Sequence, residues 1–188
     1  AAGLSLTGKS AFTNSFAVFA AGRAYDQIRQ SISIPKLNVK ITGSSAGLSD
    51  FGDGSTHQSV EDVAIMRAIP NMTVLVPADG TEVRKMTRKI CEYNGPVYMR
   101  INRNDLPDVV PEDHDFEIGK PYIIRDGSDI VIYANGIMVS RALQAAEQLE
   151  KENISARVVN VSSLKPVDEN SIKKFAAGVK GIITAEEH

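Results

Sequence analysis

LNVKITGSSAGLSDFGDGSTHQ, residues 37–58, is the stretch that decides the fold of this chain. Its first six residues alternate between apolar and polar side chains, which predicts a β-strand over Leu37–Thr42. The next sixteen residues contain four glycines, which let a backbone turn sharply and approach a ligand closely. Asp53 and His57 place two titratable side chains at the far end of this loop. Open α/β sheets bind ligands beyond the carboxyl ends of their strands, so we expect a binding site here.

Strands and helices alternate on both sides of this stretch, which is typical of a mainly parallel α/β sheet. Apolar runs and alternating patterns predict strands over Ser10–Thr13, Leu37–Thr42, Met72–Val76 and Pro96–Ile101. Helical spacing and start signals predict helices over Phe16–Ile32, from a capping box of Ser59 and Asp62 to Ala68, and from a capping Asp79 to Tyr93. These elements form a first block, assigned to residues 1–104.

The composition changes after residue 104. Between Asp105 and Glu117 there are six acidic residues, two prolines and no Lys or Arg, which predicts an exposed acidic linker over residues 105–127. A smaller α/β block follows over residues 128–188, with predicted strands 129–135, 154–161 and 181–184 and helices 138–152 and 168–176. We therefore expect two α/β units joined by a linker.

The bulk composition excludes several classes of protein. The formal net charge of −2 provides no broad basic surface, so neither nucleic acid nor an anionic membrane is expected as a partner. No apolar run approaches the roughly 18 residues of a membrane span. Cys91 is the single cysteine, which favours a reducing, cytoplasmic location. Residues 1–8 resemble the end of a helix closed by Gly8, and residues 181–188 a strand without a follower, so we expect a piece of a longer protein.

His57 and Asp53 are the sharpest candidates for chemistry. A histidine in a glycine-flanked loop could donate a hydrogen bond to a developing oxyanion, or be a surface histidine without a role. Asp53 could accept a hydrogen bond from a substrate hydroxyl, or form an ordinary Asp-Gly turn. Gly52-Asp53-Gly54 resembles the metal-binding motif of thiamine-diphosphate enzymes. The next asparagine, Asn71, lies too close and begins a strand, so we predict no metal site.

Aromatic and basic side chains gather at the ends of other predicted strands. Phe12, Phe16 and Phe19 cluster where a strand meets a helix. They could stack on a heteroaromatic ring or form ordinary core. Arg100 and Arg103 flank the end of the last strand of the first block, where arginines suit phosphate or stay solvated.

Together these motifs resemble transketolase, in particular the C-terminal half that some bacteria encode as a separate subunit. The resemblance covers nearly the whole chain and is carried by AAGL (1–4), SFAVFAAGR (15–23), GDGSTHQ (52–58), Glu61-Asp62, Arg67, IPN (69–71), VPAD (76–79) and RNDLP (103–107). It implies an α/β, thiamine-diphosphate-binding fold: a pyrimidine-binding domain, with helices on both faces of a parallel sheet. Part of a smaller α/β C-terminal domain then follows.

The resemblance also implies a reaction, the transfer of a two-carbon ketol unit between sugar phosphates. Phe16 and Phe19, together with Arg23, would bind the aminopyrimidine of thiamine diphosphate. His57 would be the catalytic residue that contacts the adduct of cofactor and substrate. The cofactor carries the carbanion chemistry, whereas protein groups position and polarise it.

Substrate recognition is implied for four further residues. Asp53 would read a substrate hydroxyl, and Arg103, supported by Arg100, would bind the substrate phosphate. Ser45 stands where many relatives have a histidine, which puts in question which sugar phosphate donates the ketol unit. The family's essential glutamate would lie just before Ala1, and its diphosphate-binding domain, with a divalent metal such as Mg, is absent here. We therefore expect activity only with an N-terminal subunit or domain, in a homodimer formed through the pyrimidine and C-terminal domains.

Related families share this domain and stay open as alternatives. They are 1-deoxyxylulose-5-phosphate synthase and the beta subunits of 2-oxo-acid dehydrogenases. Residues 23–27, RAYDQ, resemble the synthase as much as transketolase, whereas residues 103–107, RNDLP, favour transketolase. A silent α/β assembly or binding subunit is the non-enzymatic alternative.

Overall fold

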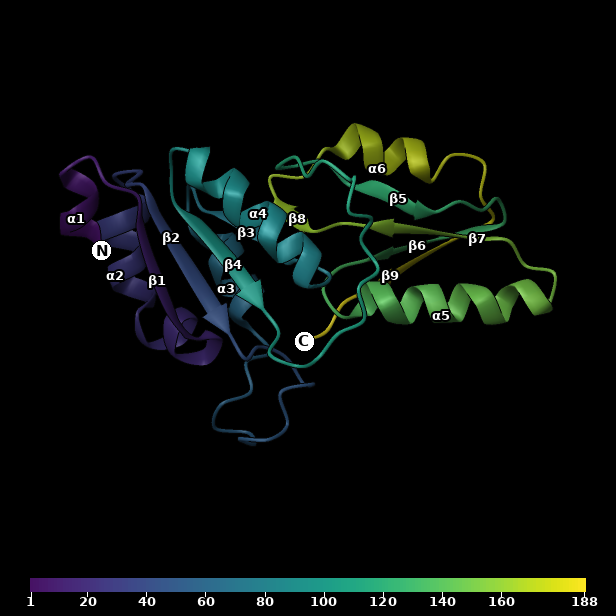
Figure 1. Cartoon of the computed structure of the whole chain (residues 1–188), viewed down its shortest axis with the longest axis horizontal. Helices are drawn as coiled ribbons and strands as arrows, with labels where there is room; N and C mark the ends of the chain where they lie inside the picture. The colour runs from purple at the N-terminus through teal and green to yellow at the C-terminus, as the bar shows by residue number, and fades with distance from the viewer.

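The computed structural model describes residues 1–188 and contains two β-sheets that lie side by side (Figure 1). In spatial order the first sheet consists of β1 Ala11–Phe16, β2 Val39–Ser44, β4 Val97–Ile101, β3 Thr73–Leu75 and β8 Ser163–Lys165. The second sheet consists of β5 Tyr122–Arg125, β7 Ala156–Asn160, β6 Ile130–Ala134 and β9 Gly181–Ala185. Only β5 and β8 run antiparallel to their neighbours. The expected α/β fold with parallel sheets is confirmed.

Each sheet is covered by helices on both faces. The helices are α1 Ala2–Leu6, α2 Tyr25–Ile28, α3 Asp62–Ala68, α4 Gly80–Glu92, α5 Met138–Lys151 and α6 Glu169–Phe175. The continuous helix predicted over residues 16–32 is interrupted. Strand β1 extends to Phe16, and two π-helical turns, η1 Phe19–Arg23 and η2 Arg29–Ser33, flank α2. Such turns occur often at functional sites, and η1 carries Phe19.

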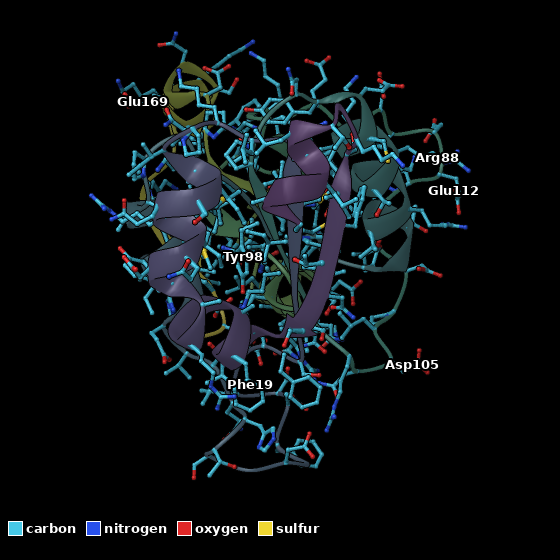
Figure 2. The ribbon with its side chains drawn as sticks, turned by 90° about the vertical axis from the view of Figure 1, so that its left-hand side faces the viewer. Phe19, Arg88, Tyr98, Asp105, Glu112 and Glu169 are labelled. Atoms are coloured by element: carbon cyan, nitrogen blue, oxygen red, sulfur yellow. The ribbon has the colours of Figure 1, made fainter.

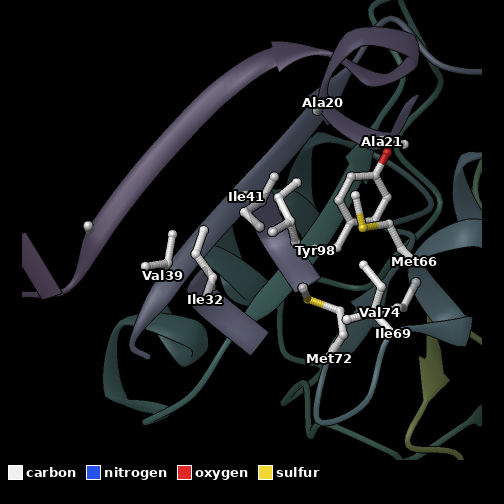
Figure 3. Close-up of a cluster of buried hydrophobic side chains, with 12 residues drawn as sticks. Ala20, Ala21, Ile32, Val39, Ile41, Met66, Ile69, Met72, Val74 and Tyr98 are labelled. Atoms are coloured by element: carbon white, nitrogen blue, oxygen red, sulfur yellow. The ribbon is translucent and has the colours of Figure 1, made fainter. Parts of the chain in front are cut away.

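The core of the first unit follows from the alternation of side chains along its strands. On β4, Val97 and Met99 face α4, where they pack with Met86 and Ile90. Tyr98 faces the opposite side and packs in a cluster with residues of α3 and the 19–33 segment (Figure 3). Both faces of β4 are therefore buried, as is usual for a central parallel strand, whereas most of the edge strand β1 is exposed.

The register of the parallel strands brings three strand ends to one edge. Phe16 of β1 pairs with Ser44 of β2, and Ser44 pairs with Ile101 of β4. Figure 1 shows the arrowheads of β2 and β4 at this edge, from which residues 45–61 project. The predicted loop therefore lies at the carboxyl end of the sheet.

The two units are joined more closely than the sequence predicts. Strand β8 comes from the second block, yet it pairs antiparallel with β3 of the first sheet. The carboxylate of Glu82, at the start of α4, is completely buried. It accepts hydrogen bonds from Ser162 Oγ at 2.7 Å and from Asn160 Nδ2 at 3.1 Å. A strand pairing and a buried polar network therefore connect the units.

The segment expected as an exposed acidic linker, residues 105–127, is only partly exposed. Val110 and Phe116 are buried in the two units' cores. Asp79 Oδ2 accepts hydrogen bonds from the backbone N–H groups of Val109 and Val110, each at 2.7 Å. The final part of the segment forms β5 and pairs with β7. The composition of the segment did not predict these contacts, because the acidic residues of the segment lie between the apolar residues that are buried.

The predicted helix starts have different outcomes. Asp79 caps α4 as predicted, because its Oδ1 accepts a hydrogen bond from the backbone N–H of Glu82 at 2.8 Å. The capping box of Ser59 and Asp62 is wrong: α3 has Glu61 at its N-cap position, and no side chain caps it. Asp62 instead forms a buried ion pair with Arg100, which is described below. No helix of the chain is both long and apolar enough to cross a membrane.

Candidate functional site

Residues 43–58, here called the glycine loop, continue from the end of β2. A Cβ atom at Gly43 would clash with the phenol of Tyr98, so the strand can pass over that ring only with glycine. Gly47 has a φ of +91°, in the region that favours glycine. These two positions explain why the sequence uses glycine where the strand becomes a loop.

Three rings meet beside the glycine loop, and we call them the aromatic corner: Phe16, Phe19 and His57. The two phenyl rings are nearly parallel, with 6.1 Å between their centroids. The imidazole of His57 lies edge-on to both, at 5.5 Å from Phe16 and 5.3 Å from Phe19. All three side chains are half-buried. Figure 2 shows Phe19 at the end of the molecule from which the loop projects. The structure thus brings together three residues predicted from separate segments.

Two polar side chains complete the aromatic corner. The guanidinium carbon of Arg23 lies 4.7 Å from the centroid of Phe19, which is a cation–π distance. Thr56 Oγ1 lies 2.8 Å from His57 Nδ1. When this hydroxyl donates to Nδ1, the ring proton is on Nε2, and Nε2 is then a hydrogen-bond donor. Phe12, in contrast, is exposed and forms no part of this group.

Arg103 links two carboxylates of the glycine loop. Its Nε lies 2.6 Å from Asp50 Oδ1, and its Nη1 lies 2.8 Å from Asp53 Oδ2. Asp50 is buried, whereas the Arg103 and Asp53 side chains are 42% and 37% exposed. Two of the three guanidinium nitrogens of Arg103 are therefore paired within the protein, and only Nη2 is left to bind a ligand. On Asp53, Oδ1 is likewise left without an ion-pair partner.

A second arginine lies deeper, in a group we call the ionic base: Tyr98, Arg100 and Asp62. Arg100 Nε is 3.3 Å from Asp62 Oδ2, and these side chains are 5% and 1% exposed. The Tyr98 hydroxyl donates to Asp62 Oδ2 at 2.6 Å. Burial, together with the Asp62 carboxylate, raises the pKa of Tyr98 well above its ordinary value. This group fixes the ends of β4 and α3 beneath the loop.

Two residues expected to bind substrate are inside the protein instead. Arg100 uses its guanidinium on Asp62 and, through Nη1, on the backbone oxygen of Glu187 at 2.8 Å. Ser45 is 2% exposed and has a φ of +55°. Both side chains are therefore buried in this chain, and we propose that Arg100, whose guanidinium is occupied by Asp62 and Glu187, belongs to the framework of the site.

Sequence reasoning missed three acidic residues of this region. Asp50 and Asp62 are buried opposite the two arginines, and Glu187 reaches the glycine loop from the end of the chain. No local signal in the sequence indicates these pairings, because each joins residues that are far apart along the chain.

Comparison with known proteins identifies the family. The family model of the transketolase pyrimidine-binding domain matches residues 1–109. The model of the transketolase C-terminal domain matches residues 119–188. The chain belongs to the transketolase family. The predicted resemblance is thereby confirmed, and the two matched regions correspond to the two sheets except for β8, which lies in the second region but pairs with the first sheet.

Individual relatives support this assignment. A solved structure, described as a split gene transketolase, inactive beta4 tetramer, is 48% identical with a TM-score of 0.92, covering 100% of this chain and 61% of its own. The 6-deoxy-6-sulfo-D-fructose transketolase subunit SqwH of Clostridium sp. is 43% identical, covering 99% of this chain and 58% of itself. The 1-deoxy-D-xylulose-5-phosphate synthase of Geobacillus thermodenitrificans is 39% identical, covering 100% of this chain but 30% of itself. The chain thus spans about three fifths of the first two relatives.

Proposed function

We propose that this chain is the C-terminal part of a transketolase, which transfers a two-carbon ketol unit between sugar phosphates with thiamine diphosphate. One observation carries the proposal: the half-buried aromatic corner and the exposed Arg103–Asp53 pair both lie beside the same glycine loop, which contributes His57 to the first and Asp53 to the second. The corner offers flat apolar surface for a heteroaromatic ring, and the pair offers groups for a hydroxylated, anionic substrate. The named transketolase subunits among the relatives support the same conclusion.

The aromatic corner suits the pyrimidine half of thiamine diphosphate. Phe16 and Phe19 would hold the ring, because two parallel phenyl groups that stay half-exposed can stack on a further aromatic ring. Arg23 would cover the outer side of Phe19. When bound, the cofactor supplies the carbon nucleophile and the electron sink that ketol transfer requires.

His57 would act on the substrate oxygen. Its ring is held edge-on by both phenyl groups and by Thr56, so its position is fixed before a ligand arrives. A donor at Nε2 would hydrogen-bond the oxygen on which negative charge develops. Groups placed in advance in this way lower the barrier because they need no reorganisation during the reaction.

Asp53 and Arg103 would bind the sugar phosphate. Asp53 Oδ1 would accept a hydrogen bond from a substrate hydroxyl, while its Oδ2 stays on Arg103. The free Nη2 of Arg103 would donate to a phosphate oxygen, which is a charge-assisted contact. Because Asp50 anchors the same guanidinium from inside, the substrate meets a positioned arginine.

The diphosphate and its divalent cation would be bound by another domain or subunit. We propose a cytoplasmic assembly with an N-terminal, diphosphate-binding partner that holds Mg, and a homodimer through the pyrimidine and C-terminal domains. The name of SqwH, a transketolase subunit, supports a divided enzyme.

The test is reconstitution. The full-length protein that contains this chain is combined with its diphosphate-binding partner, thiamine diphosphate and Mg, and sugar phosphate products are identified by mass. The proposal predicts products longer by two carbons that keep the hydroxyl group on C1. A 1-deoxy product would assign the chain to the synthase, for which the 39% identity is the supporting observation. Neither product from a folded complex would indicate a silent assembly subunit.

A further inference from the structure

The end of β9 brings one carboxylate to the inner side of the glycine loop. Glu187 lies just beyond β9, and its Oε1 accepts a hydrogen bond from the backbone N–H of Ser49. Its Oε2 lies 3.4 Å from Asn102 Nδ2, and its backbone oxygen accepts from Arg100 Nη1 at 2.8 Å. Figure 1 shows the C-terminus between the two units, close to the end of β4. The bond from the Ser49 N–H to Glu187 is the one hydrogen bond between the second unit and the glycine loop.

The loop is shaped to admit this carboxylate. A Cβ atom at Gly47 would lie 2.5 Å from Cδ and from Oε2 of Glu187. The absence of a side chain at Gly47 is therefore what lets the carboxylate reach the backbone of the loop. Ser49 is also held by Asn102, whose Nδ2 donates to Ser49 Oγ at 2.5 Å, and by Asn104, whose Nδ2 donates to Ser49 O at 2.9 Å. The Ser49 backbone is consequently fixed from three sides.

The fixed residue adjoins the substrate-reading pair. Asp50 follows Ser49 directly, is buried, and forms an ion pair with Arg103. Arg103 in turn holds Asp53. A movement of Ser49 would shift Asp50, and with it the guanidinium whose Nη2 we assign to the substrate phosphate. The aromatic corner is not part of this connection, because His57, Phe16 and Phe19 have their own contacts.

We propose that Glu187 is a positioning residue through which the C-terminal unit sets the Arg103–Asp53 pair for the sugar phosphate. This role rests on the proposed function. Glu187 touches no substrate atom. It acts through the Ser49 N–H, and it gives the C-terminal domain a specific part in substrate recognition besides its packing.

The first test measures the connection without any reaction. Amide-resolved hydrogen exchange is recorded on the full-length protein for Glu187→Ala, Glu187→Gln and Glu186→Ala. Glu186 is the matched control, because it is the neighbouring carboxylate and its one ion-pair partner is His188 at 3.8 Å. Glu187→Ala should speed exchange of the Ser49 amide about tenfold, since its acceptor is lost. Glu187→Gln keeps an oxygen at this position and should restore slow exchange, and Glu186→Ala should match the wild type.

The second test uses the assembled enzyme. Glu187→Ala should raise KM for a phosphorylated ketose about tenfold, with kcat and Tm close to wild type. KM for an unphosphorylated analogue should rise less, because that analogue uses only the Asp53 half of the pair, and Glu187→Gln should restore most of the difference. A role in packing alone would lower Tm and kcat together and would not distinguish the two substrates.

The outcomes separate this proposal from the proposed function. Unchanged Ser49 exchange in Glu187→Ala, or equal effects of Glu187→Ala and Glu186→Ala, would overturn the positioning role even in an active transketolase. An assembled enzyme without ketol transfer would overturn the proposed function instead, while the exchange measurement would still decide whether Glu187 holds the loop.

Discussion

The aromatic corner and the ionic base lie at the same end of the first sheet, yet solvent reaches them very differently. Phe16, Phe19 and His57 are half-buried and pack mainly on one another. Arg100 and Asp62 are 5% and 1% exposed, and both are occupied by partners within the protein. At one end of one sheet, the groups that can meet a ligand are thus different residues from those that hold the loop. Residue type does not distinguish them, since Arg100 and Arg103 are three positions apart and differ mainly in burial.

The largest effect should follow from breaking the ionic base. Arg100→Met leaves the buried Asp62 carboxylate without its cation. Removal of one partner of a buried ion pair costs about 3–5 kcal/mol of stability. Urea unfolding of the full-length protein measures this loss. The double variant Arg100→Met/Asp62→Asn removes the uncompensated charge and should recover part of it. If Arg100→Met instead unfolded like the wild type but lost affinity for phosphorylated substrate, the division between the two groups would be wrong.

The next effect concerns catalysis at the aromatic corner. His57→Ala should lower kcat of the assembled enzyme about 10²–10³-fold, because a positioned donor is lost. Affinity for the cofactor and Tm should change little, since Phe16 and Phe19 keep their contact. His57→Gln retains a donor and should recover part of the rate.

A packing role for His57 makes a different prediction. In that case both variants would lose Tm and activity in parallel. A fully active His57→Ala enzyme would remove this residue from the mechanism.

A smaller effect on substrate affinity is expected at Arg103, which joins a buried carboxylate, Asp50, to an exposed one, Asp53. Arg103→Ala should weaken phosphorylated substrates about tenfold or more relative to unphosphorylated analogues, because it removes a charge-assisted contact. The variant also leaves Asp50 without its cation. Arg103→Ala/Asp50→Asn is therefore the control, and its substrate discrimination should stay lost while its stability improves. Equal losses for both substrate classes would indicate a structural residue.

The smallest effect should be a pH dependence at the junction of the units. Burial raises the pKa of Glu82 above its ordinary value of about 4.5, so the folded protein binds this proton more tightly than the unfolded chain. The stability contributed by this proton is complete below pH 4.5 and is lost as the pH rises through the raised pKa. Relative to Glu82→Gln, the wild type should therefore lose Tm between pH 4.5 and neutral pH. A Tm difference that is independent of pH would contradict the raised pKa.

Local patterns predicted most elements but not their long-range partners. Asp79 caps α4 as predicted, and the strand predicted over residues 37–42 forms two residues later, as β2 Val39–Ser44; both signals depend on neighbouring residues. Strand β8 has three residues and exists because it pairs with β3, which no local signal indicates. Asp62 has the spacing of a capping residue, but its carboxylate instead binds Tyr98 and Arg100 of β4, which are distant in the sequence.

The candidate site divides in the same way. Aromatic and histidine residues were recognisable because they concentrate in a chain with 6% aromatic residues. Their meeting at one corner follows from the strand register. The roles of the arginines were not recognisable, because burial decides them. Glu187 could not be connected to the glycine loop from sequence, since 138 positions separate it from Ser49.

A titration of thiamine diphosphate by calorimetry tests the division between corner and base most directly. It is made on assembled enzyme carrying either Phe19→Leu or Arg100→Met. Phe19→Leu keeps apolar volume but removes the flat ring, so Kd should rise about two- to tenfold with Tm nearly unchanged. Arg100→Met should lower Tm and leave the Kd of the remaining folded enzyme unaltered. An unchanged Kd for Phe19→Leu together with a weakened Kd for Arg100→Met would contradict the account.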